Sequence, residues 1–398
     1  MKKIVAIALA CLTLPAGASA LPQYAAQEQK QCIHCHTDPG GGGARNFRGQ
    51  YFEAHEYSFA GFDEAAAARP SSGSGSALET LLEAISFSGE LRALYSVAEG
   101  PHDELGSGCE SCHAPGQRAP DNSFFLMQGE LGVSARITEK LAFRYSNDLG
   151  ITRDVYATMR FCDGSTFVKV GAFQVPYGLE NFADHNALVK VRHNVGSNLR
   201  DVGVQTTVQT ARYFASLAVL NGRPRFSQSS PVLEGSIDQD GTPAIVLRAG
   251  VNTPRGRFGA SLLHDNSGRG SAQRETFGGA FGSVYMGRWR FHGELDFGQE
   301  RFGSAQRSNI GALAQGTLEV LDHTEVSARF DRYDPDTDVD DDGETWYSLL
   351  VEHHLSQNAS LQGRFRLRNE DYETLGSGSS QFNVAGNDDA LLMLYVHF

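Results

Sequence analysis

Apolar and polar residues alternate with a period of two from about residue 84 to the end of the chain. In one segment Ile85, Phe87, Leu91, Tyr95 and Val97 alternate with Ser86, Ser88, Glu90, Arg92 and Ser96. This period is typical of β-strands, in which successive side chains point to opposite faces. The polar face is rich in charge, and an apolar face toward lipid with a charged lumen explains this better than a soluble sandwich does. The pattern therefore predicts an all-β fold, a transmembrane antiparallel β-barrel.

Counting the alternating segments predicts about sixteen strands, an even number as bacterial barrels require. The expected connections alternate in length, with short turns on the periplasmic side and long loops outside. The long loops are expected at 99–122, 174–199, 222–242, 333–344 and 370–386. The short turns are expected near Thr138-Glu139, Cys162-Asp163-Gly164, Thr210-Ala211, Thr253-Pro254, Met286-Gly287, Asp322 and Ser356-Gln357.

The first eighty residues differ in character from the predicted barrel. Two lysines, an apolar run and the small residues Ala18-Ser19-Ala20 predict a secretory signal peptide over residues 1–20. Residues 21–80 form a separate small region that ends in a Ser/Gly-rich linker, and the barrel is expected over 84–398. The small region is too short for a large core of its own.

Composition narrows the classes of function. A formal net charge of −13 argues against nucleic acid as a partner. No run after the leader is long and apolar enough for a transmembrane helix. Four of the six cysteines fall in two short motifs. The remaining two are Cys11 in the leader and the isolated Cys162, so an extensive disulfide framework is excluded.

The two motifs are Cys-x-x-Cys-His sequences at 32–36 and 109–113. Two thiols on one short turn can add to the two vinyl groups of a haem, and the adjacent histidine is then placed to bind the iron. Zinc would need two more ligands, and no second cysteine pair accompanies either motif. The sequence therefore predicts two covalent haem c groups, attached at Cys32 and Cys35 and at Cys109 and Cys112, with His36 and His113 as iron ligands.

The sixth iron ligands are less closely specified. His55 is the candidate for the first haem and His102 for the second, with His185 and His193 as alternatives on a long loop. Met127 is a poor candidate because it shares the lipid-facing phase of the nearby apolar residues. An open sixth position would instead permit ligand binding or peroxidase chemistry.

Strand parity places the two motifs on opposite sides of the membrane. The first precedes the first strand and belongs to the periplasmic side or the lumen. The second lies in the 99–122 loop, which is expected at the outer mouth, across an apolar band of roughly 25 Å. Several arginines are expected to face the lumen. In the default interpretation they are simply solvated residues of the lumen wall, and in the alternative some of them bind haem propionates as charge-assisted pairs. The arginines concerned are Arg92, Arg136, Arg144, Arg160, Arg290, Arg329, Arg364, Arg366 and Arg368.

An acidic run occupies the predicted outer loop at 334–343. It imitates the start of a calcium loop, but Leu349 stands where the bidentate glutamate of an EF-hand belongs. The default interpretation is a solvated acidic loop, and the alternative is that it gathers a cation at the outer mouth.

In its architecture the chain resembles the fused cytochrome–porins of iron-oxidising bacteria. The resemblance rests on 32–36 with the following Asp38-Pro39-Gly40 and Asn46-Phe47-Arg48-Gly49, on the porin-like stretch 171–179, and on the terminal Phe398. It implies that an N-terminal c-type haem docks at an outer-membrane barrel and moves electrons through it. The second haem motif departs from that family, which typically carries one.

These observations favour an electron-transfer protein over a turnover enzyme. The expected partners are a periplasmic electron carrier, an extracellular electron donor or acceptor, and outer-membrane lipid. A diffusion porin with a haem-bearing plug or sensor is one alternative, and a barrel-anchored haem peroxidase is another. A conduit requires six-coordinate haem and an occluded lumen, a porin requires ion conductance, and a peroxidase requires high-spin iron.

Overall fold

The structure is a computed structural model. It describes five residues of the N-terminal region, Cys35, Arg48, Gly49, Phe52 and Phe59, and most of the chain from residue 85 onward. The described ranges are 85–98, 122–138, 140–149, 151–161, 165–179, 200–210, 212–222, 242–253, 255–266, 273–321, 323–340, 342–356, 359–370 and 389–397.

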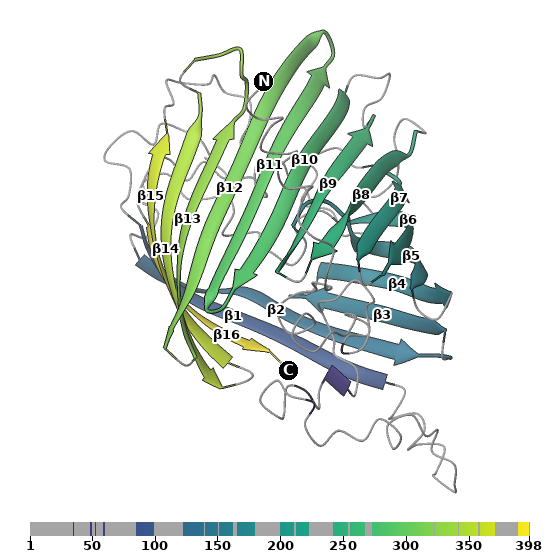
Figure 1. Ribbon diagram of the computed structural model, residues 1–398, viewed down its shortest axis with the longest axis horizontal. Helices are drawn as coiled ribbons and strands as arrows, with labels where there is room; N and C mark the ends of the chain where they lie inside the picture. Colours follow the sequence, from purple (N-terminus) through teal and green to yellow (C-terminus); the bar gives the residue numbers. More distant parts are fainter. Residues whose placement is uncertain are drawn as a thin grey trace, which may run out of the picture.

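Sixteen antiparallel strands in the described part of the chain form one closed barrel (Figure 1). Each strand pairs with the next along the chain, and β1 pairs with β16 to close the ring. The predicted all-β transmembrane barrel is therefore confirmed. The strands are β1 Ile85–Ala98, β2 Asn122–Arg136, β3 Leu141–Asp148, β4 Ile151–Phe161, β5 Thr166–Gln174, β6 Arg200–Gln209, β7 Tyr213–Leu220, β8 Ala244–Thr253, β9 Gly256–Asp265, β10 Gln273–Met286, β11 Trp289–Phe302, β12 Ala305–Leu321, β13 Thr324–Asp334, β14 Glu344–Ser356, β15 Ala359–Glu370 and β16 Asp389–His397.

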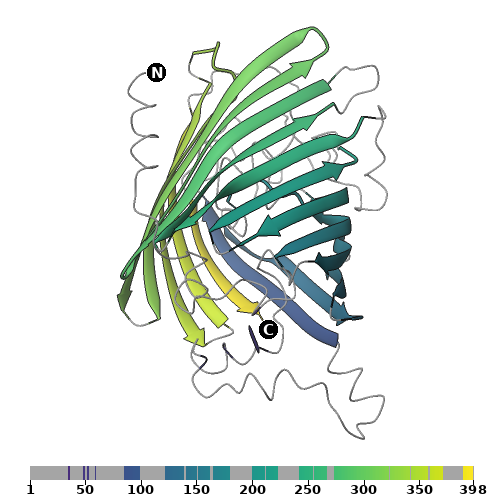
Figure 2. The ribbon, with the colours of Figure 1, turned by 45° about the vertical axis from the view of Figure 1, so that its right-hand side comes forward.

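Figure 2 shows the tilted strands of the wall. The connections between consecutive strands differ in length at the two rims of the barrel. At the rim where β1 begins and β16 ends, every link between consecutive strands is short, and each falls at a turn that the sequence predicts. The opposite rim carries the long connections, but the β3–β4 and β11–β12 links there are also short. The rim with uniformly short turns is the periplasmic one by the usual rule for such barrels.

The two faces of the wall carry opposite chemistry. In β7, for example, exposed and buried residues alternate without exception, with Leu217 outside and Ser216 inside. Large apolar side chains are exposed on the outer face of most strands, as required for contact with lipid. Charged side chains are buried on the inner face, including Asp296 and Asp331, both fully buried. No helix in the described part of the chain is long and apolar enough to cross a membrane.

A β-bulge changes the expected phase of Met127. The β1–β2 register shifts between Arg92 and Ala93, which pair with Gln128 and Leu126, so Met127 is the extra residue. Its side chain packs against a buried cluster on the inner side of the wall, formed by Leu94, Leu391 and Met393. The expectation that Met127 faces lipid is therefore wrong, because the inserted residue interrupts the period of two.

The β13–β14 connection contains the acidic run. Asp338 and Asp340 are exposed, as expected for a solvated loop. Asp342, in contrast, is buried, and this burial together with the charges of Asp334 and Asp336 raises its pKa to about 6. The default interpretation of a solvated acidic loop therefore holds for Asp338 and Asp340 but is wrong for Asp342.

We expect the β13–β14 connection to lose stability as the pH rises through about 6. The folded-state pKa of Asp342 lies above the value of about 3.9 in an unfolded chain. The stabilisation that the protonated carboxyl gives to the folded connection is therefore complete below about pH 4 and is lost above about pH 6. Hydrogen exchange of residues 335–343, corrected for intrinsic rates, should show more protection at about pH 5 than at about pH 7. Asp342→Asn should abolish the difference, whereas Asp338→Asn should keep it. Equal protection of the wild type at both pH values would contradict this assignment.

Candidate functional site

The segment 175–179, called the lumen segment here, leaves the wall after β5 and lies inside the barrel. Pro176 has no N–H to donate and cannot continue a β-ladder, which explains why the strand ends there. Val175 and Tyr177 are fully buried. Upstream, Gly171 adopts a φ of 131°, and a Cβ there would lie 2.2 Å from the carbonyl oxygen of Val155. Glycine therefore permits the distorted backbone just before the chain turns inward.

Hydrogen bonds tie the lumen segment to the inner wall. The Tyr177 hydroxyl donates to Oδ1 of Asp296 at 3.0 Å. The backbone N–H of Gly178 donates to Oγ of Ser261 at 2.9 Å, and that of Leu179 donates to Oε2 of Glu294 at 2.9 Å. Because the acceptors belong to β9 and β11, the segment is fixed against one side of the barrel.

Arg248 of β8 completes this attachment. Its Nε donates to the carbonyl oxygen of Gly178 at 2.9 Å. The guanidinium carbon lies 4.9 Å from the ring centre of Phe214 and 4.7 Å from that of Phe281, within cation–π range. The aromatic contacts hold the buried cation in place, so it can anchor the segment.

A group of arginines on β15, called the basic cluster here, faces the lumen. It consists of Arg364, Arg366 and Arg368, and all three approach one carboxylate, Asp389 of β16. The closest atoms lie 2.9 Å away for Arg364, 3.7 Å for Arg366 and 2.5 Å for Arg368. Asp331 of β13 also interacts electrostatically with Arg364 and Arg366. Two carboxylates cannot neutralise three guanidinium groups, so the cluster carries excess positive charge.

The centre of the basic cluster retains hydrogen-bonding capacity. Arg366 is buried, and its guanidinium carbon lies 3.9 Å from the ring centre of Trp346. Its Nε and Nη2 atoms are buried without a hydrogen-bond partner among the described residues. Buried donors of this kind are costly unless an acceptor reaches them. The arrangement can therefore bind an anionic group such as a carboxylate.

An apolar surface adjoins the basic cluster on the inner wall. It is formed by Leu94, Met127, Leu391 and Met393, and it is called the apolar patch here. Leu391 pairs with Arg364 in the β15–β16 ladder, which makes the two surfaces direct neighbours. Together they place buried apolar side chains directly beside a group of cations on the inner wall.

The predicted haem-binding residues lie outside the described residues, apart from Cys35. Cys35 occupies a turn and is half-buried. The assignments of these residues as haem attachment sites or iron ligands stay predictions. The residues concerned are Cys32, His36, His55, His102, Cys109, Cys112 and His113, together with His185 and His193.

Sequence reasoning identified some of the residues that line the lumen and missed others. Arg329 and Arg366 were expected to face inward and are buried there, whereas Arg136 is exposed near the rim. Arg248, Asp296 and Asp389 were not singled out. Their phase within each strand indicates an inward position, but their partners could not be read from it.

No protein-family model and no curated protein matches the chain. Solved structures do match. The outer-membrane OmpT of Vibrio cholerae has a TM-score of 0.56 at 11% identity, with 79% of this chain and 97% of that chain covered. An anion-selective porin from Comamonas acidovorans has a TM-score of 0.54 at 13% identity, with 79% of this chain and 99% of that chain covered. The outer membrane channel DcaP of Acinetobacter baumannii has a TM-score of 0.56 at 10% identity, with 79% of this chain and 97% of that chain covered. At this level of identity the likeness shows the fold alone: the chain has the barrel fold of outer-membrane porins.

Proposed function

We propose that this protein is an outer-membrane dihaem c-type cytochrome fused to a porin-like barrel, and that it conducts electrons between the periplasm and the cell exterior. One observation carries the proposal: the two Cys-x-x-Cys-His motifs are joined to opposite ends of β1. Residues 32–36 precede Ile85 at the rim with short turns, and 109–113 follow Ala98 at the other rim. Along the sequence, a single strand that crosses the apolar band lies between the two motifs, which supports haems on opposite sides of it.

Two features of the described part of the lumen support haem binding. Its propionates require cationic donors, and Arg366 has two buried nitrogen atoms without hydrogen-bond partners among the described residues. Its macrocycle requires apolar neighbours, and the side chains of the apolar patch lie beside Arg364. When bound, haem supplies reversible one-electron exchange at its iron. The role of these protein residues is to bind the propionates and to exclude water from the macrocycle.

The proposed partners follow from the two rims. A periplasmic electron carrier would dock at the rim where β1 begins, and an extracellular donor or acceptor at the rim where it ends. The exposed aspartates Asp338 and Asp340 lie on the latter rim, in the β13–β14 connection. Their negative charge favours cationic species at this mouth.

A diffusion porin is the second candidate, and the lumen segment favours it. A chain segment fixed inside a barrel narrows the passage and leaves a selective path for small solutes. In that case the haem motifs would serve as a plug or a sensor. Measurements of haem content and of ion conductance separate the two functions.

The purified outer-membrane protein should contain two covalently bound haems per polypeptide. Cys109→Ser should reduce this number to one, because the second thioether attachment is broken. Pyridine haemochrome absorbance measured against protein concentration gives the ratio. Cys162→Ser removes a cysteine outside both motifs and should leave the ratio at two. A ratio that Cys109→Ser does not change would remove the second redox centre from the proposal.

The wild-type protein should show little steady ion conductance in planar bilayers, because a conduit needs an occluded lumen. Arg248→Ala should raise the conductance, since the lumen segment loses a charged hydrogen-bond donor, which costs about 2 kcal/mol. The matched control is Arg257→Ala: Arg257 also stacks on Phe214 but makes none of the contacts that hold the segment. High wild-type conductance would support the diffusion porin instead.

A further inference from the structure

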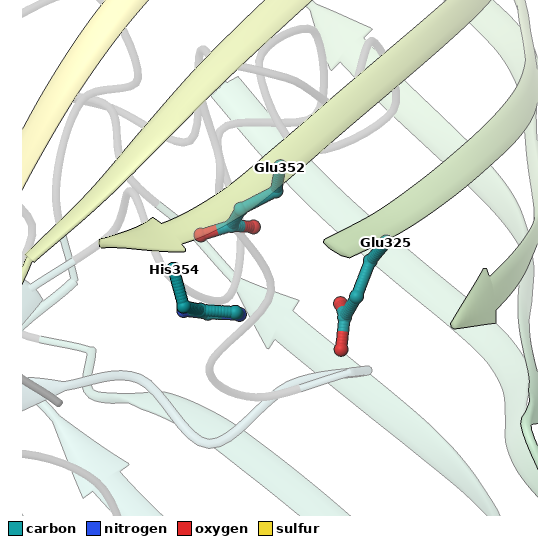
Figure 3. A group of neighbouring side chains, drawn as sticks. All are labelled: Glu325, Glu352 and His354. Carbon is teal, nitrogen blue, oxygen red and sulfur yellow. The ribbon is translucent and has the colours of Figure 1, made fainter. Parts of the chain in front are cut away.

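A separate group of ligand-type side chains lies on the inner wall near the periplasmic rim (Figure 3). It consists of Glu325, near the start of β13, and Glu352 and His354, near the end of β14. One ligand atom from each residue lies within 4.8 Å of the other two, and all three side chains are partly buried. Two carboxylates and one imidazole therefore converge on a single point.

The strand register produces this convergence. Glu325 and Glu352 are directly paired across the β13–β14 ladder. His354 follows two residues later and shares the face of Glu352. The intervening His353 is exposed on the other face, where its Nδ1 lies 2.9 Å from Oγ1 of Thr324. The ligand positions are consequently set by the rigid wall and not by a loop.

The charges at this point are incompletely balanced. Carboxylates that face each other directly across a ladder repel. Glu325 forms an ion pair with Arg290 of β11. Glu352 accepts hydrogen bonds only from neutral groups, at 2.8 Å from Oγ of Ser360 and at 3.4 Å from Nε2 of Gln362, and no described cation pairs with it. One negative charge therefore lacks a counter-ion among the described residues.

Hydrogen bonds from the neighbouring strand restrict the orientation of the Glu352 carboxylate. Ser360 and Gln362 hold the two oxygens of Glu352 from the neighbouring strand β15. Outer contacts of this kind fix the geometry of metal-binding carboxylates. The His354 ring has no hydrogen bond among the described residues, so its nitrogen is available to a metal.

We propose that Glu325, Glu352 and His354 bind a divalent first-row transition metal such as Zn²⁺ or Fe²⁺. One imidazole nitrogen and two carboxylate oxygens suit these ions, whereas Ca²⁺ and Mg²⁺ select oxygen ligands. Water fills the remaining positions. The bound cation neutralises Glu352 and competes with Arg290 for Glu325. This site does not depend on the haem proposal.

Zinc binding to the chelator-treated holoprotein tests the site. Equilibrium dialysis with metal analysis should find one Zn²⁺ that His354→Ala weakens at least about tenfold, as expected for the loss of a ligand. Glu352→Gln should act likewise. The matched control is His353→Ala, which removes the outward-facing neighbour and should retain wild-type affinity. Arg290→Gln should bind Zn²⁺ more tightly, because Glu325 then has no competing cation.

A spectroscopic measurement distinguishes ligation from a general loss of structure. With Cu²⁺ as the probe, electron paramagnetic resonance should show nitrogen hyperfine coupling in the wild type and in His353→Ala, but not in His354→Gln. Retention of the folded barrel is checked by its migration on unheated gels. The proposal is overturned if the wild type binds no Zn²⁺, if His354→Ala and Glu352→Gln bind it as the wild type does, or if His353→Ala weakens binding equally.

Discussion

Closure of the backbone hydrogen-bond ladder is the constraint on which the rest of this structure depends. A strand in lipid has no water to satisfy its N–H and C=O groups, so every strand must have a neighbour on both sides. The first and last strands meet this requirement through each other, from Glu90 paired with His397 to Ala98 paired with Asp389. Because the ring is closed, no open edge remains, and each strand has one lipid-facing and one lumen-facing side.

The closed wall concentrates charge in a confined interior. Adjacent strands bring inward-facing residues directly opposite one another, and the ladder fixes which charges meet. Three arginines of β15 surround Asp389, and Glu325 faces Glu352. Each arrangement leaves a charge excess of a definite sign, positive in the basic cluster and negative at the periplasmic rim. Binding of an anion at the positive excess, or of a cation at the negative one, lowers the electrostatic free energy of the protein.

The two groups of lumen residues belong to different sets of strands. The lumen segment is attached to β8, β9 and β11, whereas the basic cluster and the apolar patch belong to β15, β16, β1 and β2. In a ring of sixteen strands these groups lie about half a turn apart. The segment that narrows the lumen and the surface proposed to bind a haem therefore lie on different sides of the barrel.

The sequence by itself determined the strands, the short turns and the inward phase of residues such as Arg329 and Arg366, because a period of two is a local property of the chain. It also contains the two Cys-x-x-Cys-His motifs on which the haem proposal rests, because such a motif consists of five consecutive residues. Only the tertiary structure decided that Met127 packs inside, since a bulge depends on the partner strand. The same holds for Tyr177 and Asp296, which are 119 residues apart. It holds for Glu325 and Glu352 as well, because register and lumen contacts exist only once the strands have paired and the ring has closed.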